Sequence, residues 1–181
     1  MRKQLLIVLC VAFIAGCNNK PEAAVEATST APATEAKPAP AEFADPKYAE
    51  IGKKGLANLT AGDIDAWMGS YADNAVYAWN NGDSLPNKAA IGDYWKKRRT
   101  EAIETITFSN DIWLPVKVNQ PQQTEKTGIW LLGWYKVDTK YKTGKNMSQW
   151  IHTLMHFNDE DKIDRVLQFL DRAPINAAMT K

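Results

Sequence analysis

The chain has 181 residues, which is enough for one folded domain and additional segments. Its 22 Lys and Arg residues nearly balance its 21 Asp and Glu residues, and this balance argues against a nucleic-acid-binding protein. Cys10 and Cys17 are the two cysteines, so the sequence after them can form neither a disulfide nor a cysteine-based metal site.

Residues 1–16 have the pattern of a signal peptide. Arg2 and Lys3 precede an apolar stretch over residues 5–14, which is too short to span a bilayer comfortably. The stretch Ile14-Ala15-Gly16-Cys17 then resembles the lipobox of bacterial lipoproteins, in which the signal is cut before a cysteine whose sulfur carries the lipid. This resemblance implies a membrane anchor on Cys17. The alternative is an ordinary secretory signal with an incidental cysteine.

The residue after Cys17 bears on the destination of the protein. It is Asn18, not the Asp that favours inner-membrane retention in the Gram-negative lipoprotein pattern. The resemblance therefore implies the cell envelope, and in a Gram-negative host the outer membrane, facing the periplasm. Residues 17–42 comprise the lipidated cysteine and an Ala/Pro-rich tether, which we expect to be disordered because its only large apolar residue is Val25. The folded domain is expected to cover residues 43–181.

Three helices are predicted at the start of this domain. Asp45 and Pro46 are typical of a helix cap and a first helical residue. Asp63 can cap a second, short helix, and Asn87 can cap a third. In the second helix, apolar residues recur at helical spacing and form one face: Ile64, Trp67, Met68 and Tyr71.

Two short segments complete the helical half. Residues 72–74, Ala-Asp-Asn, are expected to form a turn before a strand that contains Val76, Tyr77 and Trp79. The basic run Lys96–Arg99 is interpreted as the solvated C-terminal end of the third helix, where cations suit the helix dipole.

The second half of the domain changes to strand patterns. We predict strands near residues 104–118, 127–138, 146–157 and 162–172, with turns at Thr143–Gly144 and at residues 158–161. Pro115 suggests an edge or a bulge in the first of these strands. Helices followed by a run of strands indicate an α+β fold.

The stretch from Ala61 to Val76 resembles the start of the NTF2-like superfamily, which includes ketosteroid isomerases, scytalone dehydratases and SnoaL-type polyketide cyclases. The matching residues are Ala61-Gly62-Asp63, Trp67 and Tyr71-Ala72-Asp73-Asn74-Ala75-Val76, and the element order over residues 43–172 also fits. The resemblance implies a cone in which three N-terminal helices pack on a curved, mostly antiparallel mixed sheet. This fold hosts many functions, so the resemblance does not identify a reaction.

The residues at the catalytic positions of the isomerases argue against that reaction. The resemblance places Trp79 at the position of the general base, and Gly55 and Thr153 at those of the two oxyanion-hole donors. A steroid isomerase needs a base and donors at these places. We therefore expect no steroid-isomerase activity.

The apolar faces of the predicted helices predict a pocket inside the cone, together with the strand residues that the resemblance implies to point inward. Thr153 and Gln168 would be its polar groups. No metal or other cofactor is expected in it. The predicted pocket residues are Trp67, Tyr71, Trp79, Tyr94, Trp95, Thr153, Val166 and Gln168.

Three other polar residues are weighed for chemistry. His152 and His156 stand four apart in one strand and so lie on one face, but no third metal ligand has a fixed spacing to them, and we interpret both as structural. Asp171 lies near the end of the last predicted strand, where SnoaL-type cyclases carry an acidic residue, and is the candidate catalytic residue.

Three functions follow from this pattern. The preferred one is a lipid-anchored, non-catalytic module that binds a small apolar molecule. The second is an isomerase, dehydratase or cyclase that uses Asp171 with a histidine or a tyrosine. The third is a protein–protein scaffold in the envelope.

The hairpin of residues 127–157 predicts self-association. Pairing Trp134 with Trp150 would place Trp130, Leu132, Trp134, Trp150, His152 and Leu154 on one face, while the opposite face is apolar as well. Helices can cover only one of the two faces. We therefore expect a homodimer through the outer face of the sheet, unless residues 43–48 or the C-terminal tail cover it.

Overall fold

The computed structural model describes residues 38–121 and 125–180. The predicted signal peptide, the lipid-attachment residue Cys17 and most of the predicted tether lie outside these residues. Within them, no helix is long and apolar enough to cross a membrane.

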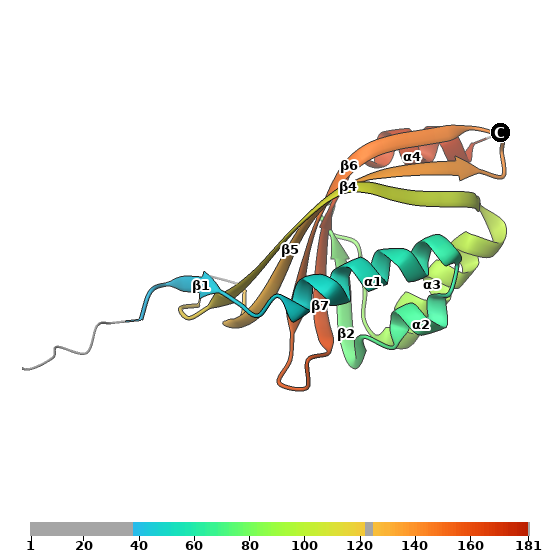
Figure 1. Ribbon diagram of the computed structural model, residues 1–181. Coiled ribbons are helices and arrows are strands. Elements are labelled where there is room, and N and C mark those ends of the chain that lie inside the picture. Colours follow the sequence, from blue (N-terminus) through green and yellow to red (C-terminus); the bar gives the residue numbers. More distant parts are fainter. Residues whose placement is uncertain (1–37, 122–124, 181) are drawn as a thin grey trace, which may run out of the picture. The chain divides into compact units, whose positions relative to one another are not determined.

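The described residues form four helices and a seven-stranded sheet (Figure 1). The helices are α1 (Lys47–Ala61), α2 (Ile64–Met68), α3 (Lys88–Glu101) and α4 (Arg172–Met179). The strands are β1 (Ala41–Phe43), β2 (Tyr71–Trp79), β3 (Ser84–Leu85), β4 (Ile103–Val118), β5 (Gly128–Tyr141), β6 (Asn146–Phe157) and β7 (Ile163–Phe169).

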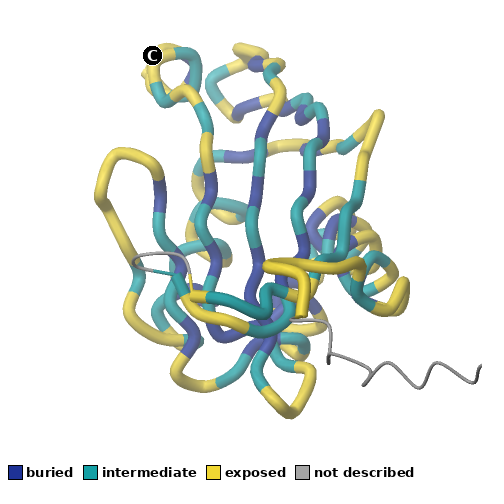
Figure 2. Tube along the Cα trace, turned by 90° about the vertical axis from the view of Figure 1, so that its left-hand side faces the viewer, coloured by how far each residue is buried: buried dark blue, intermediate teal, exposed yellow. Residues whose placement is uncertain are grey.

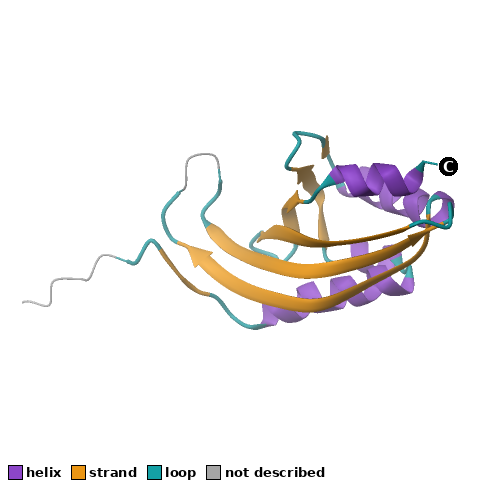
Figure 3. Ribbon diagram, turned by 90° about the horizontal axis from the view of Figure 1, so that it is seen from above, coloured by secondary structure: helices purple, strands orange, loops and turns teal. Residues whose placement is uncertain are grey.

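The sheet is mixed and strongly bent. Its strand order is β1-β4-β5-β6-β7-β2-β3, and all neighbours are antiparallel except β2 and β7, which are parallel. The long strands bend along their length (Figure 3), and α1, α2 and α3 gather on one side of the sheet (Figure 1). The predicted α+β cone with three N-terminal helices on a curved sheet is confirmed.

Two predicted helix caps are present. The Asp63 carboxylate accepts a hydrogen bond from the Ala66 amide at 2.9 Å, and the Asn87 side chain accepts one from the Ala90 amide at 2.9 Å. Asp45 accepts from the amide of Lys47 at 2.8 Å, but α1 begins at Lys47, one residue later than predicted. Each cap satisfies a backbone donor that the first helical turn leaves free.

The short second helix ends earlier than predicted. It stops at Met68, the chain turns at Gly69–Ser70, and Tyr71 already begins β2. The predicted turn at residues 72–74 is therefore wrong. These residues lie in an irregular part of β2, where the pairing with β7 shifts register between Tyr71 and Val76. Pairing of Tyr71 and Val76 with β7 on either side holds these turn-forming residues in an extended segment, so tertiary contacts override their local preference.

Both ends of the domain differ from the prediction. Ala41 and Glu42, which were assigned to the disordered tether, form β1 against Val118 and Lys117 of β4. At the other end, β7 stops at Phe169, and a fourth helix that was not predicted follows.

The hairpin between β5 and β6 has a different register from the predicted one. Trp134 pairs with His152 and not with Trp150. The turn is centred on Thr143, where the Tyr141 amide donates to the carbonyl of Lys145 and Gly144 adopts a φ of 85°. This moves the pairing by two residues. A shift of two leaves each side chain on the same face of the sheet, so the predicted division into two faces still holds.

The outer face of the sheet is partly apolar and only partly covered, since Trp130 and His156 are buried there against the carbonyls of Lys126 and Thr127. A row of paired residues crosses four strands there: Ile112, Trp134, His152 and Phe169. Ile112 is 57% exposed and Phe169 is 42% exposed. The two segments that were the alternative to a dimer as a cover for this face lie elsewhere. Phe43 pairs with β4 and Tyr48 packs in the core, and Ile175 and Ala178 of α4 pack in the core on the inner face. Figure 2 shows buried and more exposed residues alternating along the central strands.

The core lies between the sheet and the helices in two clusters. One packs Trp67 of α2 and Ile91 of α3 against Tyr71, Leu131 and Val166 of the sheet. The other lies toward α4 and includes Ile106, Val137, Tyr141, Met147 and Ala178.

Candidate ligand-binding pocket

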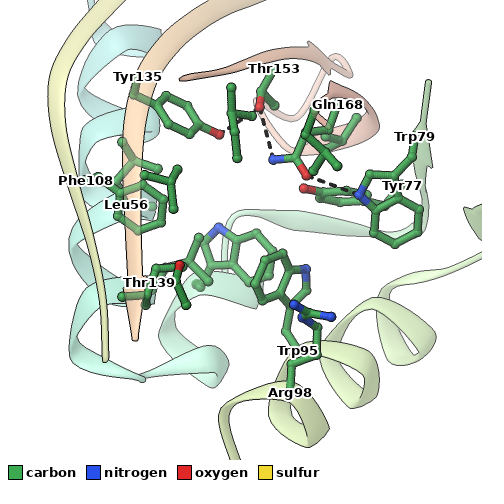
Figure 4. Close-up of a pocket in the computed structure, with 18 of the residues that line it drawn as sticks. Leu56, Tyr77, Trp79, Trp95, Arg98, Phe108, Tyr135, Thr139, Thr153 and Gln168 are labelled. Carbon is green, nitrogen blue, oxygen red and sulfur yellow. Dashed lines mark hydrogen bonds between the residues drawn. The ribbon is translucent and has the colours of Figure 1, made fainter. Parts of the chain in front are cut away.

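A cavity of about 100 Å³ lies inside the cone, between the helices and the concave face of the sheet (Figure 4). This is the same order as the cavity of about 150 Å³ that accommodates benzene in an apolar core. All eight residues predicted for the pocket line it: Trp67, Tyr71, Trp79, Tyr94, Trp95, Thr153, Val166 and Gln168. Gly55 lines it as well, so all three positions compared with the isomerases face the cavity.

The rings of the pocket pack on one another edge to face or tilted. Trp67 lies 5.1 Å from Tyr71 and 5.6 Å from Trp95 between ring centroids, and Tyr94 lies 5.3 Å from Trp79. Such pairs are more favourable than their apolar area alone suggests. The wall of the pocket is therefore a connected set of rings that the α2, α3 and β2 segments supply together.

A buried chain of hydrogen bonds forms the polar part of the pocket. The indole N–H of Trp79 donates to the Gln168 amide oxygen at 3.2 Å, and the Gln168 amide nitrogen donates to the Thr153 hydroxyl at 3.3 Å (Figure 4). The hydroxyls of Thr153 and Tyr135 are 2.7 Å apart. Adjacent positions on β6 and β7 explain the contact, since Thr153 pairs directly with Gln168. Each bond fixes the orientation of a polar group that faces an apolar cavity.

Two polar atoms on the aromatic side chains of the pocket are buried without a hydrogen-bond partner among the described residues. They are the hydroxyl of Tyr71 and the indole N–H of Trp95. A buried donor without a partner costs about 1–3 kcal/mol. A bound molecule with an acceptor could recover this free energy.

The phenol groups of Tyr71, Tyr77 and Tyr135 are donors and not bases at neutral pH. Burial raises the pKa of Tyr71 and of Tyr77 well above the ordinary value. Burial also raises the pKa of Tyr135, although its hydrogen bonds to Thr153 and Gln168 oppose this rise. Among the described residues that line the cavity there is no Asp, Glu, His or Lys.

Two arginines at the edge of the pocket were missed from the sequence. Arg98 of α3 and Arg172 at the start of α4 both line the cavity. The sequence contained a signal for Arg98, because it follows Tyr94 by four residues and Ile91 by seven and so lies on the apolar face of the helix. Interpreting the whole run Lys96–Arg99 as solvated was therefore wrong for Arg98. No local signal predicts Arg172, because α4 was not expected.

The candidate catalytic residue Asp171 lies outside the pocket. Its exposed carboxylate caps α4 by accepting a hydrogen bond from the Ala173 amide at 2.8 Å, and it does not line the cavity. Asp171 was predicted near the end of the last strand, but β7 ends two residues before it. A helix cap explains its presence without a catalytic role.

The two histidines lie on the outer face of the sheet. His152 stacks on Trp134 with ring centroids 4.4 Å apart, and its Nδ1 is 3.0 Å from the carbonyl oxygen of Gly133. Nδ1 of His156 is 2.5 Å from the carboxylate of Asp164. Among the described residues, no group of three His, Cys, Asp or Glu side chains is arranged to hold a metal ion.

Comparisons with known proteins bear on the fold. No protein-family model matches the chain, and no curated protein matches it. A solved NTF2-like protein of unknown function from Exiguobacterium sp. 255-15 is 17% identical, with a TM-score of 0.55 over 67% of this chain and 98% of that chain. A protein with a ketosteroid isomerase-like fold from Catenulispora acidiphila is 13% identical, with a TM-score of 0.54 over 72% of this chain and 92% of its own.

A third similar structure is an LEH-like epoxide hydrolase from M. tuberculosis. It is 10% identical, with a TM-score of 0.53 over 74% of this chain and 89% of that chain. Likeness at such low identity reflects the arrangement of the backbone and not a shared reaction. The chain therefore has the NTF2-like, ketosteroid isomerase-like fold, an α+β cone with an aromatic pocket inside it.

Proposed function

We propose that this domain binds a small apolar molecule in the aromatic pocket without transforming it. The observation that carries the proposal is the composition of the cavity wall, which combines packed rings and a fixed hydrogen-bond chain with no carboxylate, imidazole or lysine among the described lining residues. Pockets of this kind, largely apolar with a few placed polar groups, are typical of small-molecule sites.

The catalytic alternative has less support. General acid–base chemistry needs a group that exchanges a proton near neutral pH. Asp171 caps α4 outside the pocket, and burial raises the pKa of the phenols at Tyr71 and Tyr77, so these groups keep their protons. The neighbouring structure named as an epoxide hydrolase shares the backbone fold, and nothing in the pocket wall favours that reaction here.

We further propose that the domain works at the cell envelope. The lipobox-like stretch before Cys17 supports a lipid anchor, and Asn18 supports the outer membrane in a Gram-negative host. We also propose a homodimer through the outer face of the sheet. The exposed apolar row that contains Ile112 and Phe169 supports this, since a large apolar patch is unusual on a monomer.

Binding is tested by identifying small molecules that copurify with the protein from its native host. The Trp95→Leu variant removes one indole from the pocket wall, and Trp150→Leu removes one from the outer face, where Trp150 is 54% exposed. After extraction, mass spectrometry should find the same molecule with the wild type and with Trp150→Leu, and much less of it with Trp95→Leu.

A negative result in two experiments would contradict the binding proposal. If no molecule copurifies, and a fragment library screened by ligand-observed NMR shows no binding that Trp95→Leu weakens, the pocket is not a binding site.

A further inference from the structure

Two arginines from different helices flank an aromatic pair at the edge of the pocket. The guanidinium carbon of Arg98 is 5.6 Å from the ring centroid of Tyr94, and that of Arg172 is 5.0 Å from the ring of Trp79. The rings of Tyr94 and Trp79 are 5.3 Å apart, so the four side chains form one continuous row. Figure 4 shows Arg98 rising from its helix beside Trp95, on the side that faces the cavity.

The charge of Arg98 is not neutralised by any described residue. Its Nη1 lies 3.6 Å from the sulfur of Met179, and it forms no ion pair in the described part of the chain. The two lysines of the same basic run differ, because Lys96 pairs with Asp65 at 2.6 Å and Lys97 lies 4.0 Å from Glu101.

Arg172 is only partly satisfied. Its Nη1 is 3.3 Å from a carboxylate oxygen of Asp83, whereas its Nε is buried and has no hydrogen-bond partner among the described residues. A guanidinium in this state retains a donor that a second acceptor can use. Since no described acidic residue lines the cavity, the pocket carries an excess of positive charge at its edge.

We propose that the pocket selects apolar carboxylic acids, which it binds as carboxylates. The apolar body would fill the aromatic cavity, and the carboxylate would lie at the edge formed by Arg98 and Arg172. This inference rests on the proposed binding function and adds the chemical class of the ligand. The planar fork of an arginine matches the two oxygens of a carboxylate and forms strong, charge-assisted hydrogen bonds with them.

A doubly charged phosphate fits this edge less well. Helix N-termini bind phosphate through free backbone N–H groups. At α4 the carboxylate of Asp171 already accepts from the Ala173 amide, and its negative charge lies beside the helix start. The singly charged carboxylate encounters less repulsion there.

The test compares an acid with its neutral isostere on the full-length protein in detergent. The probes are 3-(4-fluorophenyl)propanoate and the corresponding propanamide, and binding is followed by ¹⁹F NMR at pH 7.5. We expect the acid to bind about tenfold more tightly than the amide, since hydrogen bonds to charged groups are worth more than neutral ones. Raising the salt concentration should weaken binding of the acid and leave the amide unchanged.

Variants assign the preference to the two arginines. Arg98→Gln and Arg172→Gln should each reduce the preference for the acid severalfold while the amide binds as before. Lys97→Gln removes a positive charge from the same helix at a side chain that is 72% exposed, and it should change neither affinity. Arg98→Lys should recover part of the preference.

Each other outcome contradicts the proposal. Equal affinity for acid and amide, with no salt dependence, would refute the charge selection but leave the binding function intact. Unchanged acid preference in both glutamine variants would place the anion elsewhere. If neither probe nor any fragment binds the wild type, the binding function itself fails. If a glutamine variant is misfolded, the effect of salt on the affinity of the wild type for the acid tests the charge selection instead.

Discussion

Gly133 lies where no side chain fits. A Cβ at this position would lie 2.9 Å from Cε3 of Trp113 and closer still to its Cζ3, whereas ordinary contacts begin near 3.4 Å. The ring cannot move away toward α1, because it also packs on Gly52, where a Cβ would lie 2.7 Å from the same Cζ3. Trp113 is thus held between a strand and a helix that both lack side chains at the contact.

Gly133→Ala should therefore destabilise the domain. Overpacking a well-packed core costs about 1–3 kcal/mol, and we expect about 2 kcal/mol here because the indole is confined on both sides. For a domain of this size the loss corresponds to a fall in Tm of about 4–8 °C. Thermal unfolding followed by circular dichroism and chemical denaturation measure the two quantities.

A matched glycine substitution serves as the control. A Cβ at Gly92 in α3 would meet Met68 at an ordinary distance of 3.6 Å. Gly92→Ala should raise the free energy of unfolding by about 0.5–1 kcal/mol, because alanine favours a helix interior more than glycine does.

A double-mutant cycle identifies the cause of the effect. In a Trp113→Leu background the clash is absent, so Gly133→Ala should cost much less than in the wild type. If Gly133→Ala is neutral in the wild type, or costs the same in both backgrounds, the account of a confined indole is wrong.

Three further predictions concern the anchor, the outer face and pH. Cys17→Ala should leave an unprocessed or soluble protein; normal processing and continued partition into detergent would contradict lipidation at this residue. Trp134→Glu should convert a dimer into a monomer in light scattering on a fragment that begins at residue 38, and a wild-type monomer at tens of micromolar would exclude the dimer. Burial raises the pKa of Asp164, but hydrogen bonds from Lys126 and His156 outweigh it and lower the pKa below its ordinary value. Because folding lowers the pKa of Asp164, its ionised carboxylate stabilises the folded state. This contribution is fully present above the unfolded pKa of about 3.9 and is lost as pH falls through the pKa of the folded state. The free energy of unfolding should therefore depend less on pH below about 4 in Asp164→Asn than in the wild type. The control, Asp159→Asn in the exposed turn, should behave like the wild type. If the free energy of unfolding falls with pH equally steeply in Asp164→Asn and in the wild type, the role of Asp164 is contradicted.

Features that arise from local physical chemistry could be predicted from the residues alone. The caps at Asp63 and Asn87 follow from side chains that reach backbone donors one turn away. A side-chain period of two determines which strand residues share a face, whereas the family resemblance implied that Thr153 and Gln168 point inward, where both line the cavity. The family resemblance added the order in which these elements pack.

Features that depend on partners distant in the sequence emerge only in the folded domain. The strand β1 exists because β4 offers it an open edge, and residues 72–74 extend because Tyr71 and Val76 on either side of them pair with β7. Asp171 became a helix cap because α4 begins where a longer strand was expected. The placement of Arg98 and Arg172 at one cavity joins two helices that are more than 70 residues apart in the sequence. Local patterns specify which side of an element faces inward, whereas the partner that it meets there is fixed only when the whole chain closes around a shared core.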